Sequence, residues 1–150
     1  METGKQVSVF LENKPGRLAN VLSALAREKV NVIALTVMDS KEHSALRMVT
    51  EDGPKTAQVL KALGAPFTES DVLLVELRHQ TGALAHVCET LAQEHINIDY
   101  CYVSSGGRNG KVFGIFKVSN LDKAQKILGE VSNHRRLEKP VLRDQRAYKK

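Results

Sequence analysis

Two apolar stripes of the same kind lie along the chain, one in each half. Both have the i, i+3, i+4 and i+7 spacing that places apolar side chains on one face of a helix. The first stripe is Leu18, Val21, Leu22 and Leu25, and the second is Leu84, Val87, Cys88 and Leu91. The sequence therefore predicts an amphipathic helix at the same place in each half.

Short segments rich in β-branched and apolar residues flank these helices and have lengths typical of strands. Two weaker helices are predicted at residues 54–63 and 121–130, with Pro54 in a first turn and Asn120 as a cap. The predicted strands and extended segments are residues 7–11, 30–38, 45–50, 66–68, 72–77, 96–104, 112–118 and 137–142.

The two halves of the sequence are copies of each other. Residues 13–32 and 79–98 are identical at eight of twenty positions, at an offset of 66. The identical pairs are Gly16/Gly82, Leu18/Leu84, Ala19/Ala85, Val21/Val87, Leu25/Leu91, Ala26/Ala92, Glu28/Glu94 and Asn31/Asn97. After the next strand the offset rises to 67, so that Ala57 aligns with Ala124. Such a repeat indicates two structural units of one design.

Each unit has the element order βαββαβ. This order predicts an α+β protein of two tandem ferredoxin-like domains, in each of which two helices cover one face of a four-stranded antiparallel sheet. We expect the first domain at residues 1–70, the second at 71–143 and a basic tail at 144–150. A unit of about 70 residues has a thin core and leaves one sheet face or edge bare, which favours pairing with its twin or with another chain.

The cysteines and phenylalanines of the second copy are best explained by packing. Cys88 takes the place of Leu22 and Cys101 that of Leu35, so both cysteines are expected to be small core residues. Phe113 and Phe116 are three residues apart and lie on opposite faces of a strand, unlike the aromatic pair that stacks RNA bases.

The positive charge is concentrated at the C-terminal end. The net charge is +5, and residues 134–150 hold seven Lys or Arg against two Asp or Glu, so the remainder is neutral. A neutral body argues against a nucleic-acid partner, although polyanion binding by the tail stays open. No apolar stretch approaches the ~20 residues of a membrane helix, and we expect a cytoplasmic protein without a membrane partner.

Catalytic and metal-binding patterns are missing from the sequence. The five histidines are scattered without metal-ligand spacing, and no GxSxG, HExxH or GxxxxGK motif occurs. We therefore expect no enzyme activity, no metal and no cofactor.

The segment between the first predicted strand and helix has binding chemistry. Pro15 restricts φ, and Gly16 allows a tight turn and the close approach of a ligand to the backbone. The amides that follow lie at the positive end of a helix dipole, which suits a small carboxylate. A simple turn before a helix is the alternative reading.

These residues and the repeat resemble the ACT domain family. The resemblance is carried by the Glu12–Leu18 segment (ENKPGRL), the apolar-striped helix, Val30-Asn31-Val32 and the βαββαβ frame. It covers residues 7 to about 131, or to 142 if the last extended segment is included, as a tandem pair with no attached enzyme. It implies regulatory binding of small ligands, most often amino acids, at interfaces between neighbouring domains.

The resemblance also assigns residues. In the first loop, residues 13–18, it implies that the amides of Gly16, Arg17 and Leu18 receive the ligand carboxylate. The whole first loop is Asn13, Lys14, Pro15, Gly16, Arg17 and Leu18, and the second loop, a second candidate site, is His79, Gln80, Thr81, Gly82, Ala83 and Leu84. Tyr100 and Tyr102 share one strand face and either form a pocket wall or pack across strands.

The sequence therefore predicts a non-enzymatic regulatory protein whose partners are a free amino acid and either a second copy of the chain, as a homodimer, or a regulated enzyme. Two other functions stay open at this stage. One is a ligand-free structural adaptor subunit of a metabolic enzyme, and the other is polyanion binding through the basic tail.

Overall fold

The computed structural model describes residues 1–38, 43–104 and 112–134. The four helices and six strands within them follow the predicted order, except that two predicted extended segments are joined into one strand. The predicted strand at 137–142 and the basic tail at 144–150 lie outside the described residues. The elements are β1 (Glu2–Glu12), α1 (Arg17–Arg27), β2 (Val32–Met38), β3 (His43–Thr50), α2 (Gly53–Ala62), β4 (Phe67–Leu77), α3 (Ala83–Gln93), β5 (Ile98–Val103), β6 (Val112–Val118) and α4 (Leu121–His134).

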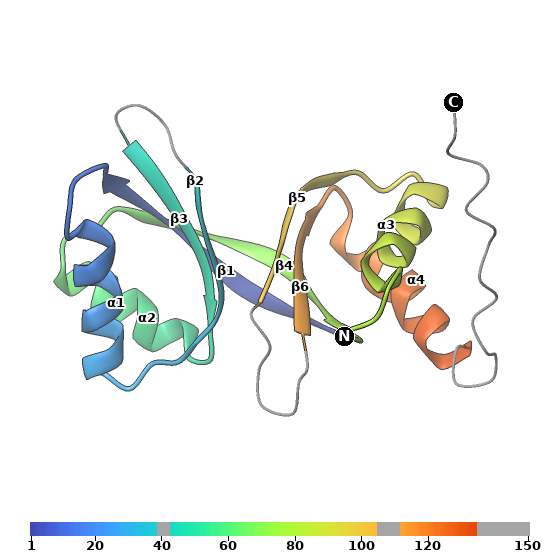
Figure 1. Cartoon of the computed structure of the whole chain (residues 1–150), viewed down its shortest axis with the longest axis horizontal. Helices are drawn as coiled ribbons and strands as arrows, with labels where there is room; N and C mark the ends of the chain where they lie inside the picture. The colour runs from blue at the N-terminus through green and yellow to red at the C-terminus, as the bar shows by residue number, and fades with distance from the viewer. Residues whose placement is uncertain (39–42, 105–111, 135–150) are drawn as a thin grey trace.

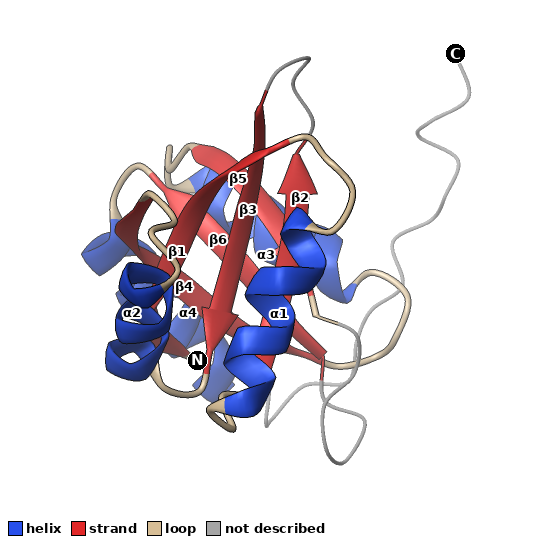
Figure 2. Ribbon diagram, turned by 90° about the vertical axis from the view of Figure 1, so that its left-hand side faces the viewer, coloured by secondary structure: helices blue, strands red, loops and turns tan. Residues whose placement is uncertain are grey.

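All six strands belong to one antiparallel sheet with the order β2-β3-β1-β4-β6-β5. Helices α1 and α2 lie on one outer side of the molecule and α3 and α4 on the other, with the strands between them (Figure 1). Turned by 90°, the molecule shows α1 and α2 in front of the sheet (Figure 2). The prediction of an α+β fold, in which helices cover an antiparallel sheet, is confirmed.

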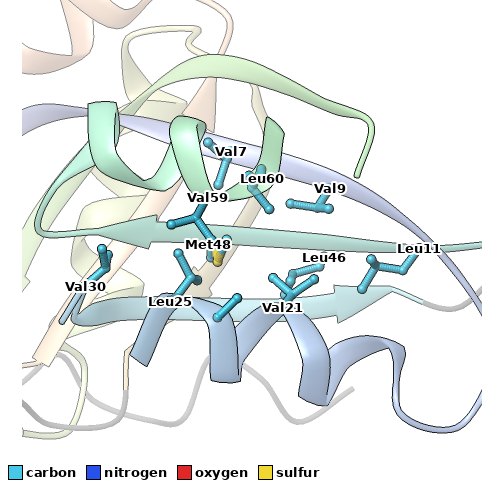
Figure 3. Close-up of a cluster of buried hydrophobic side chains, with 11 residues drawn as sticks. Val7, Val9, Leu11, Val21, Leu25, Val30, Leu46, Met48, Val59 and Leu60 are labelled. Atoms are coloured by element: carbon cyan, nitrogen blue, oxygen red, sulfur yellow. The ribbon is translucent and has the colours of Figure 1, made fainter. Parts of the chain in front are cut away.

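Three apolar cores follow from this layering. Between the sheet and α1 and α2, the buried side chains include Val9, Leu25, Leu46 and Leu60 (Figure 3). A matching core under α3 and α4 contains Leu73, Leu91, Phe116 and Ala124. The third core lies between the two halves of the sheet and consists of Ala34, Val49, Val72, Leu74, Tyr102 and Ile115. The bare sheet faces expected from the sequence therefore pack against each other.

The long strands β1 and β4 join the two halves. The C-terminal part of β1 pairs with β3, from Val7↔Met48 to Glu12↔His43. Its N-terminal part pairs with β4, where Glu2 lies opposite Leu74. Residues 2–4 thus occupy the sheet position beside β4 that a fourth strand of the second unit would take.

Strand β4 also differs from the sequence prediction. The segments predicted separately at 66–68 and 72–77 form one strand of 11 residues. The polar residues Glu69, Ser70 and Asp71 do not interrupt it, because they pair with Val7, Gln6 and Lys5 of β1. The predicted boundary between residues 70 and 71 falls inside this strand, and the division into two domains stays a prediction.

The predicted cap at Asn120 and the predicted first-turn position of Pro54 are confirmed, and the two helix caps correct the alignment of the repeat. Asp52 accepts a hydrogen bond from the Lys55 amide, with Pro54 in the first turn of α2. Asn120 accepts from the Lys123 amide in the same way, also at 3.0 Å. The offset between these caps is 68, so Thr56 rather than Ala57 matches Ala124, and the predicted offset of 67 is wrong. The second copy has two extra residues before β6.

The cysteine prediction is half correct. Cys88 packs partly buried against the core under α3 and α4, and burial raises the pKa of its thiol. Cys101 is exposed, which contradicts the expected core role. It lies on the outermost strand β5, and its repeat partner Leu35 on the outermost strand β2 is likewise 39% exposed. Tyr102 and Ala34, which are next to them on the same strands, point to the opposite sheet face and are buried there. The exposed positions are therefore on the face of the outermost strands that is turned away from the inner core.

Candidate functional site

The first loop is a hydrogen-bonded turn that ends at a left-handed glycine. Gly16 has φ 86° and precedes α1, a conformation that glycine adopts without the steric cost of a side chain. The Lys14 amide donates to the Glu12 carbonyl at 2.8 Å, and the Asn20 amide donates to the Gly16 carbonyl at 2.9 Å. A Cβ at Gly16 would meet no atom within 4 Å, so the space in front of the turn is open.

One of the three amides predicted to bind the carboxylate is already used. The Arg17 amide donates to the Lys14 carbonyl at 3.3 Å, within the turn itself. For the amides of Gly16 and Leu18, no backbone carbonyl of the described residues is an acceptor. Two of the three predicted amides are therefore left without a backbone acceptor among the described residues, and their role in carboxylate binding stays a prediction.

Charged side chains gather beside the same turn. The Glu12 carboxylate lies 2.9 Å from the Lys14 ammonium and 3.4 Å from the Arg17 guanidinium. Lys14, and then Arg17, holds the pKa of Glu12 below its usual value. All three side chains are about half exposed or more, so water and small ligands can reach them.

The second loop has the same backbone structure without the proline. Gly82 has φ 85°, the Ala83 amide donates to the Gln80 carbonyl at 3.3 Å, and the His86 amide donates to the Gly82 carbonyl at 2.9 Å. Thr81 in place of Pro15 therefore leaves the turn unchanged. The side chains differ, because Arg78 takes the place of Glu12 and Ala83 the place of Arg17. The two loops share a conformation and differ in charge.

An open pocket of about 480 Å³ lies beside the first loop. It lies between the end of β1, the first turns of α1 and the turn from α2 to β4. Its polar residues are Glu12, Arg17 and Asn20, and its apolar residues are Phe10, Leu11, Val21, Leu63, Ala65 and Pro66, with Gly64 completing it. The pocket residues outside the loop were not predicted from the sequence. Phe10 could have been found, because it lies between two core positions of a strand and so points to the opposite, solvent-facing side.

Tyr100 and Tyr102 lie elsewhere, on the inner face of the sheet. Neither is among the residues that line this pocket. The buried Gln6 carboxamide joins them: its Nε2 donates to the Tyr100 hydroxyl at 2.6 Å, and the Tyr102 hydroxyl donates to its Oε1 at 2.9 Å. The Arg47 guanidinium lies over the Tyr100 ring, 3.9 Å from the centroid. Of the two roles that the sequence left open, the geometry favours packing across strands.

Burial of Tyr102 makes the free energy of unfolding depend on pH. Burial raises the pKa of its phenol, so the folded chain binds this proton more tightly than the unfolded chain, whose tyrosines titrate near ~10. This contribution to stability is present below about pH 10 and is lost as the pH rises above it. Urea unfolding between about pH 8 and pH 11 is expected to show a larger loss of stability for the wild type than for Tyr102→Phe. Equal losses in the two proteins would contradict the assignment.

The described residues contain no group of three or more His, Cys, Asp or Glu side chains placed to hold a metal ion. Within the same part of the chain, no helix is long and apolar enough to cross a membrane.

Comparisons with known proteins place this geometry in a family. A family model described as an ACT domain pair matches residues 2–138. The chain is 28% identical over 142 residues to an aspartokinase from Mycolicibacterium smegmatis, a match that covers 84% of this chain and 33% of that protein. The chain therefore spans about a third of the length of this relative.

Solved structures show the same arrangement. The protein BT0572 from Bacteroides thetaiotaomicron matches with a TM-score of 0.79 and 33% identity, over 87% of this chain and 89% of that one. The ligand-free regulatory subunit of aspartate kinase from Thermus thermophilus matches with a TM-score of 0.61 and 13% identity, over 87% and 97% of the two chains. The latter likeness concerns the fold alone.

Proposed function

This chain belongs to the ACT domain pair family, and from that membership we propose that it is a non-catalytic regulatory protein that binds a free amino acid. The observation that carries the proposal is the first loop. The amide of the left-handed Gly16 and that of Leu18, two residues later, have no backbone acceptor among the described residues, and the space beside Gly16 is open. Such amides at the positive end of a helix suit the carboxylate of a small ligand.

The partner in this proposal is a regulated enzyme or a second copy of the chain. The aspartate kinase regulatory subunit from Thermus thermophilus, which shares this fold, supports an enzyme partner. Exposed apolar side chains on the outer strand β2, Leu35, Val37 and Met38, support protein association at that edge. A ligand that binds only the associated arrangement stabilises it through its difference in affinity for the two states.

Titration calorimetry with the twenty free amino acids tests the proposal. We expect at least one of them to release or absorb heat with saturation at a defined stoichiometry. A folded protein that gives no heat with any of the twenty would contradict amino-acid binding and favour the ligand-free adaptor.

Gly16→Val is expected to abolish this binding. Valine at φ 86° is strained by about 1–2 kcal/mol, and its side chain fills the open space through which a ligand reaches the amides. The same substitution at Gly82 imposes comparable strain at φ 85°, so comparing the two variants separates binding from stability. Calorimetry measures the first, and thermal unfolding measures the second. Retained binding in Gly16→Val would exclude the first loop as the ligand site.

A further inference from the structure

Phe10 is exposed at a position where the repeat shows that the fold does not need an apolar residue. Its side chain is 47% exposed, although the buried neighbours Val9 and Leu11 belong to the core. At the offset of 66, the residue of the second copy that matches Phe10 is Glu76, which is exposed on β4. Because a glutamate at the matching position is compatible with the same strand, strand formation does not explain why this position of β1 has an exposed aromatic ring.

The end of the sheet explains how the pocket arises next to this ring. Strand β4 begins at Phe67, which lies opposite Val9, so β1 extends beyond the first residue of β4. The Phe10 amide donates to the Pro66 carbonyl at 3.0 Å, which holds the turn from α2 against β1. Leu63 in this turn is 43% exposed and lines the same pocket. Two large apolar side chains thus remain open to solvent around one hollow.

Opposite charges lie at the edge of this hollow. Glu12 and Arg17 both line it, and their carboxylate and guanidinium groups are 3.4 Å apart and about half exposed. A free amino acid has one ammonium and one carboxylate, which match such a pair. The volume of about 480 Å³ lies within the range of about 300–1,000 Å³ typical of small-ligand pockets.

We infer that this pocket binds the apolar side chain of the amino-acid ligand and makes the protein selective for apolar amino acids. The inference rests on the proposed function and adds the class of ligand. The ligand side chain packs against Phe10 and Leu63. Its carboxylate faces the Gly16 and Leu18 amides beside the Arg17 guanidinium, and its ammonium faces the Glu12 carboxylate. The second loop lacks this selectivity, because Glu76, Arg78 and Ala83 stand where the first copy has Phe10, Glu12 and Arg17.

Calorimetry on the full chain tests the inference with three sets of probes. The first set is L-leucine, L-valine and L-phenylalanine, and the second is L-serine, L-aspartate and L-lysine. The third is 4-methylpentanoate, which has the carbon skeleton of leucine without the ammonium. We expect the tightest apolar amino acid to bind about tenfold or more tightly than any polar one and than 4-methylpentanoate.

Phe10→Glu places the residue of the second copy in the first. We expect it to weaken binding of the apolar amino acid by about tenfold or more, because it removes apolar contact and adds negative charge beside Glu12. The matched control is Val103→Glu, since Val103 is 44% exposed on β5 and does not line the pocket. Leu63→Gln removes the other large apolar contact of the pocket without adding a charge. This variant tests the inference if Phe10→Glu does not fold.

The outcomes separate this inference from the proposed function. Polar amino acids that bind as tightly as apolar ones, or Phe10→Glu and Leu63→Gln variants with unchanged affinity, would overturn the pocket and leave amino-acid binding in place. Absence of heat with every amino acid would overturn both. Equal weakening by Val103→Glu would also overturn the pocket, because the effect would then be one of general charge or stability.

Discussion

Residues 71–150, produced without the first 70, are expected not to fold. In the intact chain β4 pairs with β1, with Glu2, Thr3 and Gly4 opposite Leu74, Leu73 and Val72. Removing β1 turns β4 into an edge strand that pairs only with β6. It also uncovers the inner face of the second half, where Val72, Leu74 and Ile115 pack in one core with Ala34 and Val49.

The energetic cost of this uncovering is large. Each exposed Val, Leu or Ile side chain costs about 1.5–3 kcal/mol, and a small domain has about 5–15 kcal/mol of stability in total. Far-ultraviolet circular dichroism during heating is expected to show a cooperative transition for the full chain and none for the fragment. Adding residues 1–70 as a separate chain is the control, and it should restore the transition.

A cooperative transition of the fragment alone would contradict this expectation. It would mean that the predicted domain at 71–143 folds independently of the first 70 residues. The same measurement therefore tests the division into domains that the sequence suggested.

Gln6→Leu is expected to lower the free energy of unfolding by about 2–3 kcal/mol. Gln6 is completely buried, and its Oε1 accepts a hydrogen bond from the buried Tyr102 hydroxyl at 2.9 Å. A leucine keeps the volume and leaves that hydroxyl without a partner, which costs about 1–3 kcal/mol. The Tyr100 hydroxyl loses its 2.6 Å bond as well. Urea unfolding measures the change.

The double variant Gln6→Leu with Tyr102→Phe provides the control. Replacing both partners of a buried hydrogen bond by apolar groups is close to neutral, so the second substitution should recover part of the lost stability. Gln6→Leu within about 0.5 kcal/mol of the wild type would show that the network contributes nothing to stability.

The local elements could be predicted because their signals are local. The stripe from Leu18 to Leu25 requires only the helical period, and the cap at Asn120 requires only a neighbouring amide. The left-handed Gly16 was likewise foreseeable from the turn. The free amides of this loop were predicted less well. The Arg17 amide donates to the Lys14 carbonyl, and this bond depends on how the turn closes.

The pocket and the inner network depend on contacts between distant segments. Phe10 and Leu63 are 53 residues apart in the sequence, and Gln6 and Tyr102 are 96 apart. A comparison of the two copies does contain a signal, since Gln6 matches the apolar Val72 and Phe10 matches Glu76. Such mismatches mark positions where one copy has acquired a role that the shared fold does not require.

The sequence by itself determined the order of helices and strands, the duplication and the glycine turn before each helix, since each follows from the chemistry of neighbouring residues. Only the tertiary structure decided that β1 and β4 each run through both halves, that the bare sheet faces cover each other and that Cys101 lies exposed on an edge strand. The physical reason is that strand pairing and face packing join residues far apart in the chain, and hydrophobic periodicity selects a face without selecting its partner.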